Sequence, residues 1–357
     1  MSSDTGSYGV LLLGDLHFDG PEYHVREPEN EVQKRGRLRN FAMWEGKSQE
    51  MLAEAASRLD ERFPFVIQAG DLTQGDCDTP ELQSAMFRGC FRMLKQTFGG
   101  RTVLPVIGNH DLRLLDSEPR WNEYDASGKC LQEIVGEYGP VRDAVIPFIT
   151  QEAGLEKTPD DPQYAVRHGD DLFIFLDPFR PGGVTDFLRD TLDSAPDARF
   201  VFAVTHLTLL PCDPAKGLAL WLVPGYEEAA ALLARRNAVI LAGHTHYHHL
   251  VRYRHPEGML TQLVVSSMST NWKTGGPLRV WANDYAEYAR KMSPYVSVPQ
   301  LDCFPAENYA EHRTWCCEID GKRSSTPGYA VLDIGPQGVS AGIYTGGPQP
   351  ELELKLI

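Results

Sequence analysis

The chain has few cysteines, no long apolar run and no basic leader. Seven of its 357 residues are cysteines, an odd number, and no two of them form a Cys-x-x-Cys pair. This usage is unlike a disulfide framework and fits a reducing compartment. No apolar stretch approaches the roughly 20 residues that cross a bilayer, and the amino terminus lacks the basic and apolar segments of a signal peptide. We therefore expect a cytoplasmic protein that does not enter a membrane.

Positive charge is also scarce. Lys and Arg number 34 against 49 Asp and Glu, which gives a formal net charge of −15. A protein that binds nucleic acid usually presents a basic face, so this balance argues against a nucleic acid partner and against an anionic membrane surface. It does not exclude a local positive patch, because bound metal ions create one whatever the total charge.

Short apolar runs recur along the chain, and each ends in a polar cluster. Runs of this length that are rich in Val, Ile, Leu and Phe predict buried strands. They lie at residues 8–13, 65–69, 102–107, 171–176, 199–205 and 237–242. Helical patterns occur between and beside them, at residues 44–63, 79–98, 185–195 and 225–237. The alternation of strands and helices predicts an α/β fold with a layered sheet.

The carboxyl-terminal third is less regular. Residues 328–334 and 338–345 predict a closing hairpin, whereas the segment before them is rich in aromatic, Pro and charged residues without clear periodicity. No linker is evident, and apolar residues make up 42% of the chain. We predict a single domain over residues 1–357. It has a core at about 8–270, an elaborating segment at about 271–327 and closing strands at about 328–357.

The polar clusters at the strand ends share one chemistry. Carboxylate oxygen, amide oxygen and imidazole nitrogen are ligands that first-row divalent and trivalent metals accept, and the lack of cysteine among them disfavours a structural zinc site. Open α/β sheets build their sites at the carboxyl ends of strands, so residues remote in sequence are expected to converge. The clustered residues are Asp15, His17, Asp71, Asn109, His110, Asp111, His206, His244 and His246.

The spacing of these residues suits a paired metal site. In Asp15-x-His17 and in His244-x-His246, the alternation of a strand end predicts that both side chains share one side. Gly70 precedes Asp71 and allows a sharp bend, so the Asp71 carboxylate could lie between two ions about 3.5–4 Å apart, as in two-metal hydrolases. Taken singly, each Asp or His could instead be a satisfied core or capping residue.

Five short motifs occur in order along the chain: GDLH, GDLTQGD, GNHD, TH and GHTH. Over residues 8–270 this series resembles the calcineurin-like metallophosphoesterase superfamily. The resemblance implies a four-layer α/β/β/α sandwich and two metal ions, either Mn, Fe or Zn, or a mixed pair. It further implies that Asp71 bridges the two ions. The other implied ligands are Asp15, His17 and His246 for the first metal, and Asn109, His206 and His244 for the second.

The resemblance also assigns two catalytic residues. His110 matches the histidine that contacts the substrate phosphate or protonates the leaving oxygen, and Asp111 matches the carboxylate that orients this histidine. For Asp111, a helix-start role is the alternative. One position departs from the family pattern, because Gln74 stands three residues after Asp71. Many members have Asp there and purple acid phosphatases have Tyr, so we expect no tyrosine–iron colour.

The predicted function is hydrolysis of a phosphate ester by attack of a metal-bridging hydroxide, with His110 stabilising the transition state or donating a proton. The expected partner is a small phosphomonoester or phosphodiester substrate, so the protein would be a phosphatase or a phosphodiesterase. One alternative is a nuclease of the same superfamily, which would need a basic path that the net charge disfavours. Another is a non-catalytic metal-binding scaffold, against which the presence of His110 counts. The sequence leaves the oligomeric state open.

Candidates for substrate contacts are Arg113, just after GNHD, and Arg26. Arg26 belongs to a basic segment at residues 18–46 that we expect to be a loop overhanging the metals. This segment either binds the remote part of an anionic substrate or is simply solvated. The elaborating segment is a second candidate lid, through Asn271, Trp272 and Lys273.

The last candidate for a substrate contact is His248, which shares the strand parity of His244 and His246. The alternative for His248 and for its neighbour His249 is a surface position on the next strand.

Overall fold

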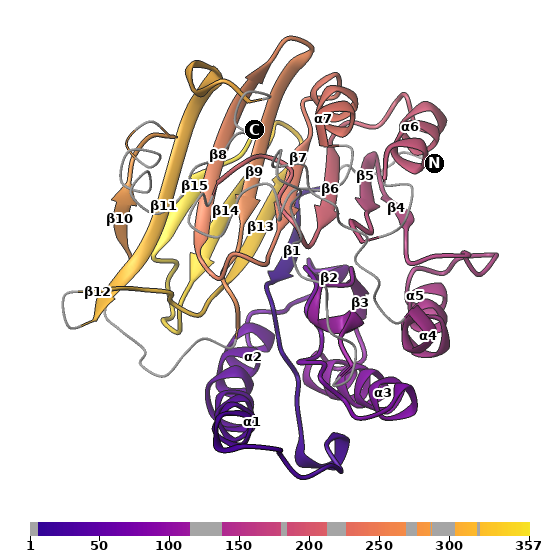
Figure 1. Ribbon diagram of the computed structural model, residues 1–357. Helices are drawn as coiled ribbons and strands as arrows, with labels where there is room; N and C mark the ends of the chain where they lie inside the picture. Colours follow the sequence, from indigo (N-terminus) through magenta and orange to yellow (C-terminus); the bar gives the residue numbers. More distant parts are fainter. Residues whose placement is uncertain are drawn as a thin grey trace, which may run out of the picture.

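Two β-sheets packed against each other form the centre of the molecule (Figure 1). The structure, a computed structural model, describes residues 6–114, 138–179, 184–212, 226–268, 277–285, 287, 304–319 and 322–357. Asn271, Trp272 and Lys273 lie outside these ranges. With helices on the outer sides, the layers form the predicted α/β/β/α sandwich.

The six-stranded sheet has the order β15-β14-β13-β1-β2-β3. Its central strand β1 pairs in parallel with β2 and in antiparallel with β13, so the two ends of the chain meet in one sheet. All six residues of the first apolar run form β1, and the predicted closing hairpin is β13–β14. The strand bounds are β1 Tyr8–Leu13, β2 Phe65–Gln68, β3 Thr102–Pro105, β13 Tyr329–Gly335, β14 Gly338–Tyr344 and β15 Leu352–Lys355.

The nine-stranded sheet runs in the order β10-β11-β8-β9-β7-β6-β5-β4, with β12 paired to β11. Strands β5, β6, β7 and β9 are parallel neighbours, and each of the first three lies within one of the predicted apolar runs. The bounds are β4 Tyr164–His168, β5 Asp171–Phe175, β6 Val201–Thr205, β7 Val239–Ala242, β8 His248–His255, β9 Gly258–Val264, β10 Arg279–Ala282, β11 Tyr309–Ile319 and β12 Lys322–Ser324.

Helices cover the outer sides of the sheets (Figure 1). The prediction for residues 79–98 is confirmed by α3, whose N-cap Thr79 accepts a hydrogen bond from Leu82 N. The longer helices are α1 Glu31–Met43, α2 Gln49–Ala56, α3 Pro80–Thr97, α5 Ile146–Glu152, α6 Thr185–Ser194 and α7 Tyr226–Ala234. The short ones are α4 Tyr138–Pro140, η1 Pro21–Tyr23, η2 Trp44–Ser48, η3 His110–Leu112, η4 Val141–Val145 and η8 Ala306–Asn308. No helix in the described ranges has the length and apolar character needed to cross a membrane.

The segment at residues 18–46 is a correction to the sequence prediction. Most of it is helical, because α1 begins at Glu31 and continues through the short π-helix η2 into α2. Helix α2 ends at Ala56 and not at residue 63, where the predicted helix ended. None of the described side chains of α1 is buried. The helix therefore has no apolar stripe that periodicity could detect, and its start is fixed by Asn30, whose Oδ1 accepts a hydrogen bond from Gln33 N at 2.9 Å.

One hydrophobic core, to which both sheets contribute, holds the described parts together. Phe65 of β2 packs edge-on against Phe173 of β5 with ring centroids 5.1 Å apart. At the edge of the sheets where β1 and β5 begin, Tyr8 donates a hydrogen bond of 2.8 Å to the Asp171 carboxylate. These contacts fix the two sheets so that β1, β2, β3, β6 and β7 end near one another. The extent of the domain over residues 1–357 stays a prediction.

Candidate metal centre

The predicted ligands lie in five loops, which begin where β1, β2, β3, β6 and β7 end. Four of the ligands have φ between 50° and 70°, namely His17, Asp71, His244 and His246. Residues other than glycine rarely adopt such angles. Those that do are often found at functional sites, where the surrounding structure enforces the conformation. The prediction that strand alternation aims Asp15 and His17 is wrong, because both lie beyond Leu13, where β1 ends. The turns of the loops aim them instead.

Two glycines allow these loops to approach one another. Gly70, as predicted, takes a bend that suits glycine, with φ of +89°, and a Cβ there would lie 2.5 Å from Nδ1 of His206. A Cβ on Gly108 would lie 2.2 Å from Oδ1 of Asp71. Any larger residue at either position would therefore push the ligand loops apart.

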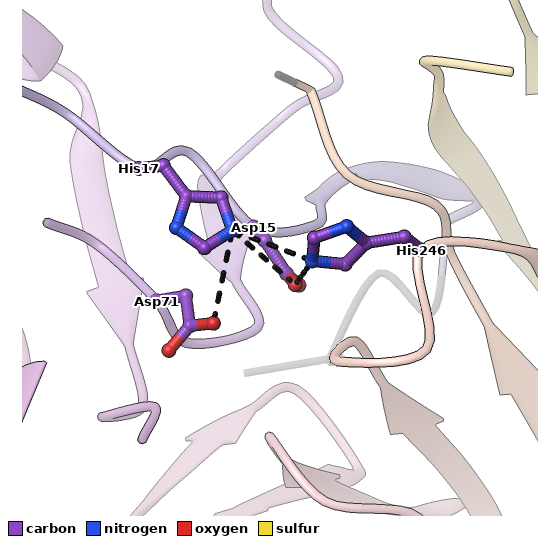
Figure 2. Close-up of side chains that lie close together, drawn as sticks. All are labelled: Asp15, His17, Asp71 and His246. Carbon is purple, nitrogen blue, oxygen red and sulfur yellow. Dashed lines mark hydrogen bonds and ion pairs between the residues drawn. The ribbon is translucent and has the colours of Figure 1, made fainter. Parts of the chain in front are cut away.

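The first group of side chains contains Asp15, His17, Asp71 and His246 (Figure 2). Nε2 of His246 lies 2.8 Å from Oδ2 of Asp15 and 3.3 Å from Nε2 of His17. Nε2 of His17 lies 3.8 Å from Oδ2 of Asp71. One potential ligand atom from each of the four residues lies within 4.8 Å of the others. The four side chains therefore point at one small volume.

The second group contains Asp71, His206 and His244, and the same 4.8 Å limit holds for its ligand atoms. Nε2 of His206 lies 3.1 Å from Nδ1 of His244, 3.4 Å from Oδ2 of Asp71 and 3.0 Å from Oδ1 of Asn109. All seven predicted ligands are thus brought together, and they divide as the resemblance implies. Asp71 is common to both groups.

Both carboxylates are held by the backbone through one oxygen and turn the other into the cluster. Oδ1 of Asp15 accepts a hydrogen bond from His244 N at 2.9 Å, and Oδ1 of Asp71 accepts one from His110 N at 2.8 Å. Their Oδ2 atoms face imidazole nitrogens. His206 is oriented in a similar way, because its Nδ1 lies 2.8 Å from the carbonyl oxygen of Ala69, so that Nε2 is left for the cluster.

The donor set fits two divalent cations. Oδ2 of Asp15 is buried and accepts no well-formed hydrogen bond, which is costly for a carboxylate unless a cation binds there. Burial raises the pKa of Asp15 and Asp71, but the nearby imidazoles of His246 and His206 outweigh burial and hold both pKa values below the usual range. Burial lowers the pKa of His17 to about 4, so its imidazole is neutral and can act as a ligand. That these residues bind metal stays a prediction.

The cluster opens to solvent on one side. The His246 side chain is 30% exposed and His110 is partly exposed, whereas Asp15, Asp71 and His206 are almost fully buried. The rings of His110 and His17 lie edge to face, with centroids 4.6 Å apart. A substrate could therefore reach the cluster past His110.

His110 is held by Gln74, which the sequence did not single out for this role. Nδ1 of His110 lies 2.8 Å from the carbonyl oxygen of Gln74 and 3.3 Å from its Nε2. Burial lowers the pKa of His110 to about 3, so the imidazole is neutral. A neutral ring donates through one nitrogen only, and the close carbonyl identifies this nitrogen as Nδ1. The only indication in the sequence was that Gln74 departs from the family pattern at this position.

Asp111, which is predicted to orient His110, has its carboxylate among donors of the loops after β2 and β3. Its carboxylate accepts hydrogen bonds from Thr73 N and Oγ1, from Leu72 N and from Gly108 N, at 2.8–3.1 Å. Burial and the nearby Asp71 raise the pKa of Asp111 to about 7 against these four hydrogen bonds. Asp111 therefore ties the loop after β2 to the loop after β3, and its role in orienting His110 stays a prediction.

The substrate-side candidates have different outcomes. Arg113 lies beside His110, with its NH1 atom 3.2 Å from Nδ1 and 3.3 Å from Nε2 of the imidazole. Arg26 is exposed, and its backbone N donates a 2.6 Å hydrogen bond to Asp78. Their contact with substrate stays a prediction.

His248 and His249 are buried, so the prediction of surface positions is wrong. Strand β11 pairs with β8 and makes it an interior strand of the sheet. Nδ1 of His248 accepts a hydrogen bond from Ser266 N, and His249 contacts Thr314. His248 is 1% exposed, which also excludes it as a direct substrate contact.

Two serines beside the cluster were missed from the sequence. Ser266 Oγ donates to the carbonyl oxygen of His246 at 2.8 Å, and Ser267 Oγ donates to that of Asp15 at 3.0 Å. They hold the backbone of two ligands from the carboxyl end of β9. Serines are common in loops, so no sequence signal pointed to them.

Comparisons with known proteins agree with this geometry. The family model described as calcineurin-like phosphoesterase matches residues 8–248, more than half of the chain. No curated protein matches the chain.

Solved structures that resemble the chain include a purple acid phosphatase from yellow lupin (Lupinus luteus) seeds, with 13% identity, a TM-score of 0.56, and coverage of 99% of this chain and 54% of that one. A structure of PhoD has 10% identity, a TM-score of 0.54 and coverage of 98% and 68%. A dimetal phosphatase from Danio rerio has 12% identity, a TM-score of 0.50 and coverage of 98% of both chains. At these identities the likeness shows the fold, and the chain spans about half the length of the lupin enzyme.

Proposed function

This chain belongs to the calcineurin-like phosphoesterase family, and from that premise we propose that it is a two-metal hydrolase of small phosphate esters. The observation that carries the proposal is the convergence of side chains from five strand ends into two groups that share Asp71, with Asn109 joined to the second group through its contact with His206. Isolated capping or core roles would not bring four imidazoles, two carboxylates and an amide together with their ligand atoms facing one another.

The residues have separate tasks in this proposal. Asp15, His17 and His246 would hold one cation, Asn109, His206 and His244 the other, and Asp71 would bridge them. When bound, the two cations neutralise charge on the phosphoryl group and lower the pKa of a water that attacks phosphorus.

His110 contributes from the open side of the cluster. Gln74 fixes Nδ1 as the donor to its carbonyl, so Nε2, which lies 3.3 Å from NH1 of Arg113, is the acceptor nitrogen on the substrate side. In the neutral form Nε2 accepts a hydrogen bond, and it can pass a proton to the leaving oxygen only after taking one up. Arg113, which lies against this imidazole, supplies positive charge beside the phosphoryl group.

The proposal is tested by assaying the purified full chain after treatment with a chelator and reloading with Mn²⁺, Zn²⁺ or Fe²⁺. The substrates are p-nitrophenyl phosphate, bis-p-nitrophenyl phosphate and cyclic nucleotides. We expect hydrolysis of at least one of them that disappears on chelation and returns with metal. Full occupancy of both sites without hydrolysis of any ester would contradict the proposal and favour the scaffold.

A further inference from the structure

The segment Gln74–Asp78 contacts three residues that the sequence singled out, namely His110, Arg113 and Arg26. The contacts come from every second residue, namely Gln74, Asp76 and Asp78. The Gln74 carbonyl faces Nδ1 of His110 at 2.8 Å, the Asp76 carboxylate lies 2.9 and 3.0 Å from NH2 of Arg113, and Asp78 accepts from Arg26 N at 2.6 Å. One short segment therefore sets the positions of the predicted catalytic histidine and of the arginine beside it.

The backbone of this segment is built for close contact. Gly75 has φ of +68°, and a Cβ there would lie 2.2 Å from the carbonyl oxygen of His110. Asp76 also has a positive φ, of 58°, although it is not glycine, and its N donates to the carbonyl oxygen of Arg113 at 3.0 Å. Such conformations cost free energy and persist where the surroundings enforce them, often at functional sites. The position of the Asp76 side chain is thus fixed by the fold.

Asp76 in turn fixes a guanidinium that would otherwise be mobile. The Arg113 side chain is 25% exposed and that of Asp76 is 31% exposed, so the pair lies at the mouth of the cluster rather than in the core. An arginine at such a position loses side-chain entropy when it is ordered. Both Asp76 oxygens contact NH2, while NH1 lies against the two imidazole nitrogens of His110. The guanidinium is therefore directed to the side of the site where His110 lies.

We propose that Asp76 is a positioning residue that holds Arg113 for the third oxygen of a terminal phosphoryl group, and that it thereby makes the site selective for monoesters over diesters. This inference rests on the proposed function. A monoester dianion presents three non-bridging oxygens and a diester monoanion only two. Where two cations take two oxygens, a fixed guanidinium gains a charge-assisted hydrogen bond from a monoester that a diester cannot offer.

The test compares Asp76→Asn, Asp76→Glu, Arg113→Ala and the unaltered chain, all loaded with the same metal. The matched control is Asp197→Asn, which removes the carboxylate from an exposed pair with Arg167. Steady-state kinetics are measured on p-nitrophenyl phosphate and bis-p-nitrophenyl phosphate. Calorimetry measures binding of inorganic phosphate and of dimethyl phosphate, which gives a readout independent of turnover.

We expect Asp76→Asn and Arg113→Ala to lower kcat/KM for the monoester by about 10- to 100-fold, the worth of one hydrogen bond to a charged group. In Asp76→Asn the loss should lie mainly in KM, and phosphate binding should weaken by a similar factor. Diester hydrolysis and dimethyl phosphate binding should change by less than about threefold, well below the worth of such a bond. Asp76→Glu should restore part of the preference, and Asp197→Asn should change nothing.

Distinct outcomes overturn the inference. An unchanged ratio of monoester to diester activity in Asp76→Asn would show that Asp76 does not position Arg113 for selectivity. An equal loss on both substrates, with a lower melting temperature or reduced metal content, would assign Asp76 a structural role only. A wild-type chain that hydrolyses diesters alone would overturn the inference and leave the proposed function standing, whereas a loaded chain that hydrolyses no ester would overturn both.

Discussion

Two fully buried carboxylates, at opposite edges of the sheets, have contrasting surroundings. Asp171, at the start of β5, accepts hydrogen bonds from Tyr8 OH, Phe200 N and two nitrogens of Arg199, at 2.6–3.2 Å. Asp15, beyond the end of β1, accepts one from His244 N and otherwise faces imidazole nitrogens. Burial alone therefore does not identify a site. The distinguishing feature is the kind of partner. Around Asp171 the partners are hydrogen-bond donors, whereas around Asp15 most of them are imidazoles that could themselves bind a metal ion.

The difference has an energetic meaning. Replacing a buried carboxylate that is paired with an arginine and with other donors lowers the free energy of unfolding, because these partners are left buried without an acceptor. A buried carboxylate that faces other ligand groups lacks such partners until a cation arrives. We therefore expect the Asp171 edge to respond in stability and the Asp15 edge to respond in metal content and turnover. Variants at the two edges test this division.

Asp71→Ala should give the largest effect, because Asp71 alone belongs to both groups of ligands. We expect turnover to fall by at least about 10⁴-fold, since the charge stabilisation of both metals is impaired. Bound metal, measured by mass spectrometry after dialysis, should fall below two ions per chain. A variant that keeps two ions and most of its activity would show that Asp71 is not required for metal binding or for turnover.

His110→Ala should separate catalysis from metal binding at the same edge. We expect turnover to fall by about 10²- to 10⁴-fold, the usual contribution of one general acid or base, while both metals remain bound. The control is Gln83→Ala, which removes a neighbouring side chain that donates to the Asp111 carbonyl without touching the His110 imidazole. If His110→Ala loses both metals, then His110 is a ligand or a structural residue.

Asp171→Asn should act on the fold and not on the chemistry. The amide cannot satisfy Arg199 as the carboxylate does, so we expect the free energy of unfolding to fall by about 2–3 kcal/mol. The specific activity at 20–25 °C should be unchanged. Denaturant unfolding checks the first statement, and Asp197→Asn on the exposed Arg167 pair serves as the control that leaves stability unchanged. A loss of activity without a loss of stability would contradict the prediction and would assign Asp171 a role in the function of the site.

Asp15→Asn in chelator-treated protein should give the smallest effect. The amide oxygen can still accept the hydrogen bond from His244 N, and the loss of attraction to the imidazoles is partly offset by relief of the cost of burying the charge and of repulsion from Asp71. We expect the free energy of unfolding to fall by about 1 kcal/mol, because the attraction to the imidazoles outweighs the two opposing effects. In the metal-loaded chain the same variant should lose the extra stability that metal binding gives. A large destabilisation of the metal-free variant would contradict this expectation and would show that Asp15, like Asp171, mainly stabilises the fold.

Much of the fold could be predicted from short-range patterns. The apolar runs before GDLH, GDLTQGD and GHTH became β1, β2 and β7, because buried strands need continuous apolar residues. Thr79 and Pro80 correctly marked the start of α3. The helix α1 could not be found in this way, because it buries no described side chain and so leaves no periodic signal.

The clustering of the candidate ligands follows from residue types and motif order, and not from strand alternation. Their residue types and order pointed to the metal cluster, but the parity of Asp15-x-His17 did not aim the side chains, since left-handed loop residues do so. The same parity argument failed for His248, which β11 helps to enclose. Contacts such as that of Gln74 with His110 depend on loops that meet only in three dimensions, so no local pattern reveals them.

The pairing of β1 with β13 bears on how the protein matures during folding. The ring nitrogens of His17 and His246 meet across 229 residues of chain, and β1 acquires its second neighbour only when the last strands arrive. Contacts of such long sequence separation form slowly, because the intervening chain must first be ordered. A nascent chain that still lacks its carboxyl-terminal third would then hold five of the seven candidate ligands and would lack His244 and His246. The capacity to retain two metal ions would thus report that the closing strands have taken their place beside β1.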